Sequence, residues 1–167
     1  MVDTLSEVLC LRSPLQPPKF TVTGFPPEAV WDVIAYGKLL PEWWKGVYLK
    51  AEPLEAYHTP RLGAKLRGEA RGFLPYHLRF LIESIELERP RVVMVRTTGE
   101  LNGTWRAELR PENGGTRVLI DEQVLAEKPI LKLLAPLLKP LFAANHRWTT
   151  PRGKAGLTAY LRSKQGS

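Results

Sequence analysis

Two charged residues lie on strand faces that are otherwise apolar. In TRVLIDEQVLA, Glu122 alternates with apolar residues, and in VVMVRTT, Arg96 shares a face with a valine and a methionine. An ionised side chain on a core face needs a partner, so Arg96 and Glu122 are candidates for a buried ion pair. The alternative is a bulge of one residue, which turns either side chain into solvent.

His146 is a third candidate for chemistry. It belongs to the polar group NHRW in an otherwise apolar C-terminal segment. If it faces a cavity, its imidazole can act as a general acid and base. The alternative is a histidine that packs against neighbours or lies on the helix surface. Arg96, Glu122 and His146 are therefore the candidate catalytic residues.

The sequence offers no pattern for a metal or a cofactor. The three histidines, His58, His77 and His146, have no HxxxH or HxH spacing, and Cys10 is the only cysteine. No nucleophile elbow, P-loop or dinucleotide fingerprint is present. We therefore expect no metal site and no cofactor.

Length and composition fit one globular domain. The chain has 167 residues, of which 44% are hydrophobic and 25% charged, as is typical of soluble proteins. The net charge of +7 comes from scattered basic residues rather than a basic run, so we expect no nucleic-acid partner. The N-terminus has no signal-peptide pattern and the single cysteine fits a reducing compartment, which predicts a cytoplasmic location.

Changes in periodicity along the chain predict its elements. Residues 1–18 are expected to form an N-terminal extension, residues 19–163 one domain and residues 164–167 a tail. Within the domain, KFTVTGF alternates as a strand does, and FPPEAVWDVI and KLLPEWW are helical. Six further strands are expected at 47–57, 63–72, 76–88, 91–99, 103–110 and 116–126, before a helix over 128–161.

Short turns between the six strands predict an antiparallel meander, because parallel strands need crossovers of about a dozen residues or more. The predicted fold class is α+β: a curved seven-stranded antiparallel sheet wrapped around the long C-terminal helix, with two short helices after the first strand. The strand YHLRFLIESIELE changes its apolar face midway. That change predicts a bulge near Glu83 and Ser84.

The strand in LGAKLRGEARG has an inner face of small residues. Its charged residues alternate with alanine, leucine and glycine, so the polar face meets water. Small inward side chains leave space in the interior. Either a closely packed helix or a ligand must fill that space.

The segment KPILKLLAPLLKPLFAANHRW forms one wide amphipathic surface when drawn as a helix. Lys128, Lys132 and Lys139 align, and the apolar face opposite them is wider than the roughly 100° stripe of a surface helix. Such a helix buries more than one side. Pro136 and Pro140 predict that it is bent or broken near residues 132–140, and it is too interrupted to span a membrane.

Five tryptophans supply large rigid surfaces that suit an apolar or aromatic ligand. Trp43 and Trp44 are adjacent on a short helix, so they are not expected to face the same core. One of them should line a pocket mouth or stay partly exposed. The alternative is that the pair packs under a loop.

The order of elements resembles the helix-grip fold of the START-related (SRPBCC) superfamily, in its polyketide cyclase/dehydrase-like branch. FPPEAVWDVI, LLPEWWKGV and GGTRVLIDEQV are similar to that family's first helix, following piece and last hairpin, and GLTAYL fits near the end of its final helix. The resemblance covers about residues 19–163. It implies a cavity between the curved sheet and the C-terminal helix, usually for a hydrophobic small molecule, and it does not imply catalysis.

The expected function is that of a carrier or sensor for a lipid, isoprenoid or polyketide-like molecule. One alternative is a cyclase/dehydrase-type enzyme acting on a polyketide-like or aromatic substrate. Another is a module that contacts a membrane surface transiently, or another protein, through the three aligned lysines. The residues expected to bind the ligand are Trp31, Trp43, Trp44, Leu66, Phe80, Met94, Arg96, Trp105, Ile120, Glu122, Leu134, Leu138, Phe142 and His146.

Overall fold

A computed structural model describes residues 9–12, 19–72, 77–126 and 135–166. The class is α+β, as predicted. In chain order the elements are β1 (Leu9–Arg12), β2 (Lys19–Thr23), α1 (Pro27–Ile34), the 3-10 helix η1 (Gly37–Leu39), α2 (Leu40–Trp43), β3 (Tyr48–Pro53), β4 (Lys65–Arg71), β5 (His77–Glu88), β6 (Val92–Gly99), β7 (Gly103–Glu112), β8 (Gly115–Ala126) and α4 (Ala135–Gln165).

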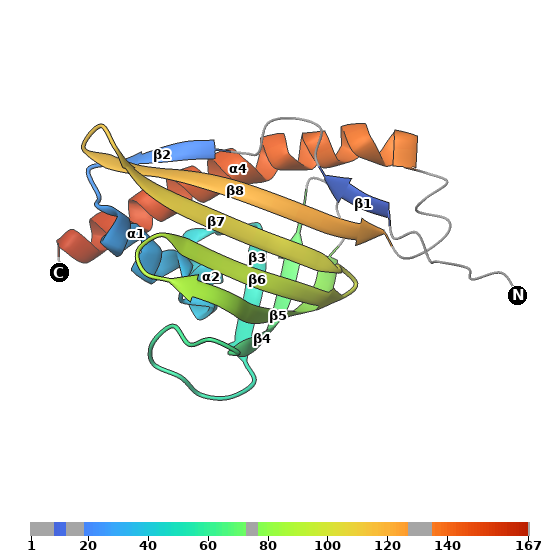
Figure 1. Ribbon diagram of the computed structural model, residues 1–167, viewed down its shortest axis with the longest axis horizontal. Helices are drawn as coiled ribbons and strands as arrows, with labels where there is room; N and C mark the ends of the chain where they lie inside the picture. Colours follow the sequence, from blue (N-terminus) through green and yellow to red (C-terminus); the bar gives the residue numbers. More distant parts are fainter. Residues whose placement is uncertain (1–8, 13–18, 73–76, 127–134, 167) are drawn as a thin grey trace, which may run out of the picture.

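The strands form one antiparallel sheet in the order β1-β8-β7-β6-β5-β4-β3, and β2 also pairs with β8 (Figure 1). All seven expected strands are present. The sequence did not predict β1, which lies within the expected N-terminal extension and pairs with residues 123–126 of β8. Because β2 pairs with residues 115–119 of the same strand, two N-terminal segments cover an edge that would otherwise expose unpaired backbone groups.

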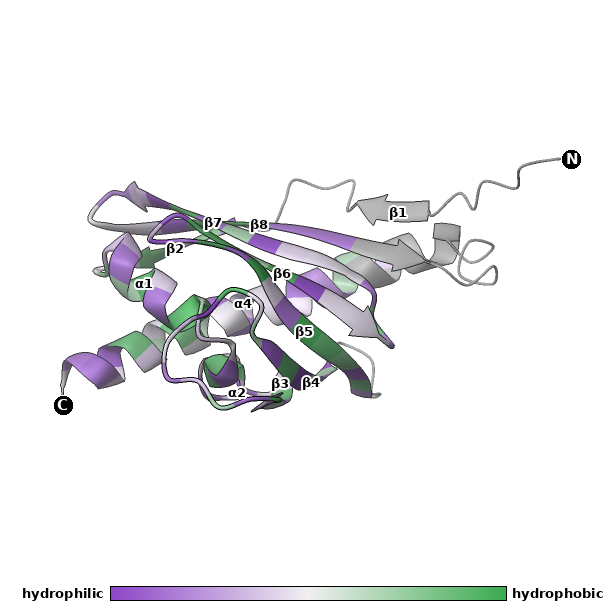
Figure 2. Ribbon diagram, turned by 60° about the horizontal axis from the view of Figure 1, so that its bottom comes forward, coloured by the Kyte–Doolittle hydropathy of each residue, from purple (hydrophilic) through white to green (hydrophobic). Residues whose placement is uncertain are grey.

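The sheet curves from β8 to β3, and the helices lie on its inner side (Figures 1 and 2). α1 contacts β6, β7 and β8, whereas α4 contacts β2, α1 and α2. In Figure 2 the hydropathy colours alternate along the strands, as expected where one face of a sheet is buried. The layer of helices on one face is the arrangement that the sequence predicts.

One local prediction for the sheet is confirmed and another is corrected. The pairing of β5 with β6 shifts between Ser84 and Glu86, next to the predicted bulge. The inner face of β4 carries small residues, but side chains of the neighbouring strand β5 fill the space over Gly68, where the sequence prediction expected a helix or a ligand. A Cβ atom at Gly68 would lie 3.0 Å from Cδ1 of Ile82 and 3.1 Å from Cε2 of Phe80, so large residues of β5 occupy the space over this glycine.

α4 is one continuous helix from Ala135 to Gln165 and contains Pro140 and Pro151. The expected break is therefore absent from residue 135 onward, while a bend at the prolines stays a prediction. Lys128, Lys132 and Leu134 lie outside the described residues, and the side chains of Leu138, Lys139 and Phe142 are likewise outside the part that the structure describes. No helix of the described residues is long and apolar enough to cross a membrane.

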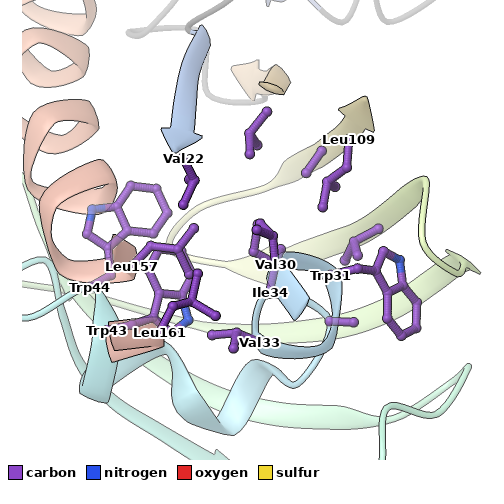
Figure 3. Close-up of a cluster of buried hydrophobic side chains, with 14 of the residues drawn as sticks. Val22, Val30, Trp31, Val33, Ile34, Trp43, Trp44, Leu109, Leu157 and Leu161 are labelled. Carbon is purple, nitrogen blue, oxygen red and sulfur yellow. The ribbon is translucent and has the colours of Figure 1, made fainter. Parts of the chain in front are cut away.

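The main core lies where α1, α2 and α4 meet the inner face of the sheet (Figure 3). Its fully buried side chains include Trp43, Leu109 and Leu157. A Cβ atom at Gly156 would overlap the carbonyl oxygen of Trp43. The absence of a side chain at this position therefore lets α4 approach α2 closely.

We predict that Gly156→Ala destabilises the protein by about 2 kcal/mol or more, because overpacking costs roughly 1–3 kcal/mol even without a backbone clash. Urea unfolding of both proteins measures the difference. The matched control is Gly166→Ala, since a Cβ atom at Gly166 meets nothing within 4 Å; we expect it to change stability by less than about 0.5 kcal/mol. Equal effects of the two substitutions would contradict the close approach.

Candidate functional site

A cavity of about 60 Å³ lies between the inner face of the sheet and the α1–α2 segment. It has room for roughly four water molecules. Its walls are mainly apolar, and every strand from β3 to β8 contributes to them. The described lining residues are Ile34, Ala35, Gly37, Leu40, Trp43, Trp44, Tyr48, Leu66, Ile82, Ser84, Val93, Val95, Thr97, Leu101, Gly103, Thr104, Trp105, Glu122 and Gln123.

Trp43 and Trp44 form one wall of the cavity together, which corrects the expectation that they would separate. Their exposed fractions are only 2% and 8%, and their rings stack with centroids 5.1 Å apart and planes 20° apart. Trp44 is the C-cap residue of α2 with φ −105° and ψ 53°. Because the chain leaves the helical conformation there, the second indole does not take the next helical direction and both rings are buried.

The two indole N–H groups have different surroundings. Nε1 of Trp44 donates a hydrogen bond of 3.0 Å to the carbonyl oxygen of Thr149 in α4. Nε1 of Trp43 is buried and has no hydrogen-bond partner among the described residues. A buried donor without an acceptor costs about 1–3 kcal/mol. The Nε1–H group of Trp43 would therefore gain from a hydrogen bond to the oxygen of a water or of a ligand.

Glu122 lines the cavity and pairs with His146 of α4 rather than with Arg96. Oε2 of Glu122 lies 3.4 Å from Nε2 of His146, and the two side chains are 29% and 21% exposed. The candidate pair of Arg96 and Glu122 is thus wrong. Within the described part of the chain, no three His, Cys, Asp or Glu side chains gather as metal ligands would.

Burial controls the protonation of the two acidic groups beside the cavity. Burial raises the pKa of the Glu122 carboxyl above its ordinary value, and the neighbouring His146 opposes that rise. Burial also raises the pKa of the Tyr48 phenol, and the negative charge of Glu122 adds to the effect. The surroundings of the cavity therefore disfavour negative charge.

Arg96 and Met94 occupy the face of β6 opposite to the cavity. Val93, Val95 and Thr97 line the cavity, and alternate residues of a strand point to opposite faces. Arg96 is 54% exposed and lies 3.9 Å from Glu83 on the outer side of the sheet. The sequence prediction for this strand was therefore shifted by one residue.

The other predicted ligand-binding residues divide into three groups. Leu66 and Trp105 line the cavity together with Trp43, Trp44 and Glu122. Three residues pack elsewhere in the core. Trp31 donates a hydrogen bond of 2.9 Å to the carbonyl oxygen of Val92 and lies apart from the tryptophan pair (Figure 3). Phe80 packs beside Leu66, and Ile120 lines a smaller space of about 10 Å³. For Leu134, Leu138 and Phe142 the structure describes no side chain.

Sequence reasoning missed Tyr48, Val95 and Thr97 as lining residues. Val95 is paired with Trp105 across β6 and β7, and residues directly opposite in a sheet share a face. The inward assignment of Trp105 could therefore have placed Val95. Tyr48 is likewise paired with Ala70 of the small inner face of β4.

We predict that Glu122→Gln gains stability relative to the natural protein as pH rises. A raised pKa means that the folded state holds the Glu122 proton more tightly than the unfolded chain. The contribution of this tighter proton binding to the free energy of unfolding is present below the ordinary pKa of 4.5. It is lost as pH rises through the folded-state pKa. Glutamine does not ionise, so urea unfolding from pH 4 to pH 8 should show a widening difference in its favour.

Glu108→Gln is the control with the opposite sign. A hydrogen bond from Arg110, helped by Arg106, lowers the pKa of the Glu108 carboxyl, so its stabilising contribution is present above the ordinary pKa and is lost in acid. This variant should lose stability relative to the natural protein at neutral pH. A Glu122→Gln difference that is flat, or that follows the Glu108→Gln difference, would contradict the burial of Glu122.

The fold is shared with solved structures of low sequence identity. No protein-family model and no curated protein matches the chain. A protein of unknown function from Staphylococcus aureus is 15% identical with a TM-score of 0.68, covering 96% of this chain and 99% of its own. An aromatase/cyclase from a Streptomyces species is 14% identical with a TM-score of 0.68, covering 89% and 94%.

Norcoclaurine synthase from Thalictrum flavum, solved in complex with dopamine and hydroxybenzaldehyde, is 12% identical with a TM-score of 0.61 and covers 98% of this chain and 94% of its own. At such low sequence identities, a structural match is evidence for a shared fold only. The resemblance inferred from the order of elements is confirmed at that level: the chain has the helix-grip fold of START-related proteins.

Proposed function

We propose that the protein binds a small hydrophobic molecule in the cavity, as a carrier or sensor. The observation that carries the proposal is the lining itself, in which stacked indoles and aliphatic side chains surround a single carboxyl group. Ligand sites combine apolar walls with a few polar groups in this way. The similar folds include an aromatase/cyclase and a synthase solved with two small aromatic molecules, which supports the proposal.

The volume of the cavity limits what it accepts. It is about 60 Å³, whereas a benzene ring fits a cavity of about 150 Å³ and drug-sized ligands use roughly 300–1,000 Å³. A ring therefore enters when a wall side chain moves. Leu101, Trp105 and Gln123 are among the half-buried lining residues and are candidates for that movement. A longer lipid, isoprenoid or polyketide-like molecule places one end here.

We predict that the protein binds toluene and that Val95→Phe reduces the affinity at least about tenfold, because the added ring fills the cavity. Isothermal titration calorimetry measures both affinities. Met94→Phe is the matched control: it adds a ring to the neighbouring residue of β6, which points to the other face of the sheet. Circular dichroism and thermal unfolding establish that each variant is folded. A natural protein that binds no toluene, or two variants with equal affinity, would contradict the proposal.

The second candidate function is acid–base catalysis on a bound carbonyl compound, and the contact between Glu122 and His146 favours it. His146 would act as the base and remove an α-proton from a ketone. The resulting enolate would take up a proton from solvent. Deuterium uptake by cyclopentanone in D₂O, followed by NMR, should then be accelerated by the protein and slowed at least about 100-fold by His146→Gln. Uptake at the uncatalysed rate would exclude this candidate for ketone substrates.

A further inference from the structure

The charges around the cavity are distributed unevenly. Glu122 is the only charged residue among the described lining residues, and no lysine or arginine is among them. The arginines of the neighbouring strands pair on the outer face instead. Arg96 lies 3.9 Å from Glu83, and Arg106 lies 3.3 Å from Glu108. The sheet therefore separates its basic side chains from the cavity.

His146 does not replace the missing cation for a ligand. Its Nε2 atom faces the Glu122 carboxyl at 3.4 Å, so any positive charge on the ring is already matched within the protein. A ligand carboxylate placed beside Glu122 would add a second negative charge in an apolar, partly dehydrated space. Like charges placed together at a buried site weaken binding, and burial already raises the pKa of the Glu122 carboxyl.

Two of the lining residues offer hydrogen-bond groups that a ligand could use, besides the hydroxyl groups of Tyr48, Ser84, Thr97 and Thr104 and the amide of Gln123 in the same lining. The carboxyl of Glu122 accepts. The Nε1–H of Trp43, which is 2% exposed, has no acceptor among the described residues. A hydroxyl group both donates and accepts a hydrogen bond, while a carboxylate only accepts and brings charge. An apolar molecule with a hydroxyl group satisfies both sites.

We infer that the cavity selects an uncharged apolar molecule that carries a hydroxyl group, an alcohol or phenol, and rejects carboxylic acids such as free fatty acids. The inference rests on the proposed function, because it specifies the chemical class of the ligand in the same cavity. Glu122 and Trp43 are the residues that determine the selection.

The test compares three probes of similar size: benzyl alcohol, toluene and benzoate at pH 7. We expect benzyl alcohol to bind more tightly than toluene and at least about tenfold more tightly than benzoate. Toluene binding equal to that of benzyl alcohol, or benzoate binding as tight as that of benzyl alcohol, would overturn the inference while leaving the proposed function intact. Failure of all three probes to bind would overturn both.

Two variants separate the charge of Glu122 from other effects. Glu122→Gln keeps the shape of the side chain and removes its charge, so the preference for benzyl alcohol over benzoate should shrink several-fold. Glu83→Gln removes one negative charge from the outer face, where Arg96 is its neighbour, and should leave the preference unchanged. Equal effects of the two variants would show that net charge rather than the cavity discriminates, and would overturn the inference.

Discussion

α4 lies so close to α2 that glycine is required at the contact. A side chain at Gly156 would overlap the backbone of Trp43, and one at Gly153 would lie 2.9 Å from the ring of Trp44. The hydrogen bond from Trp44 to the carbonyl oxygen of Thr149 adds a directional constraint. Together these contacts hold the stacked indoles in place. The indoles form one wall of the cavity, so its position depends on how α4 docks.

The sheet forms the opposite wall and determines where the space remains. Large side chains from β5 fill the region over Gly68, and one of them, Ile82, also lines the cavity together with Glu122 of β8. The shift in pairing between Ser84 and Glu86 reconciles the two apolar faces of β5. Ion pairs among arginine and glutamate side chains occupy the outer face. The result is an apolar space that contains one acidic group.

Local patterns in the sequence were sufficient for most of the fold. Alternation, turn residues and helical periodicity predicted seven strands, their antiparallel order, the bulge in β5 and the C-terminal helix. β1 was missed because four residues of strand carry too little pattern to stand out. The inward face of β6 was assigned wrongly because valines stand on both faces of VVMVRTT, and only the pairing of Val95 with Trp105 decides between them.

The candidate site was predicted in part, because its contacts join residues far apart in the chain. Glu122 and His146 were each singled out, yet their pairing depends on where α4 docks in the fold. The stacking of Trp43 on Trp44 depends on the backbone conformation at the end of α2, which residue type does not reveal. The periodicity of the sequence thus identified the polar residues of the site, but it did not predict which residues contact each other.

The indole N–H signals of the five tryptophans provide the most direct measurement of whether the cavity takes up a ligand. In a ¹H–¹⁵N NMR titration with benzyl alcohol, the Trp43 signal should move downfield as its unpartnered N–H gains an acceptor. The Trp31 signal should stay in place, because its N–H is bonded to Val92 and Trp31 does not line the cavity. A Trp43 signal that does not respond at saturating benzyl alcohol would contradict binding in this cavity.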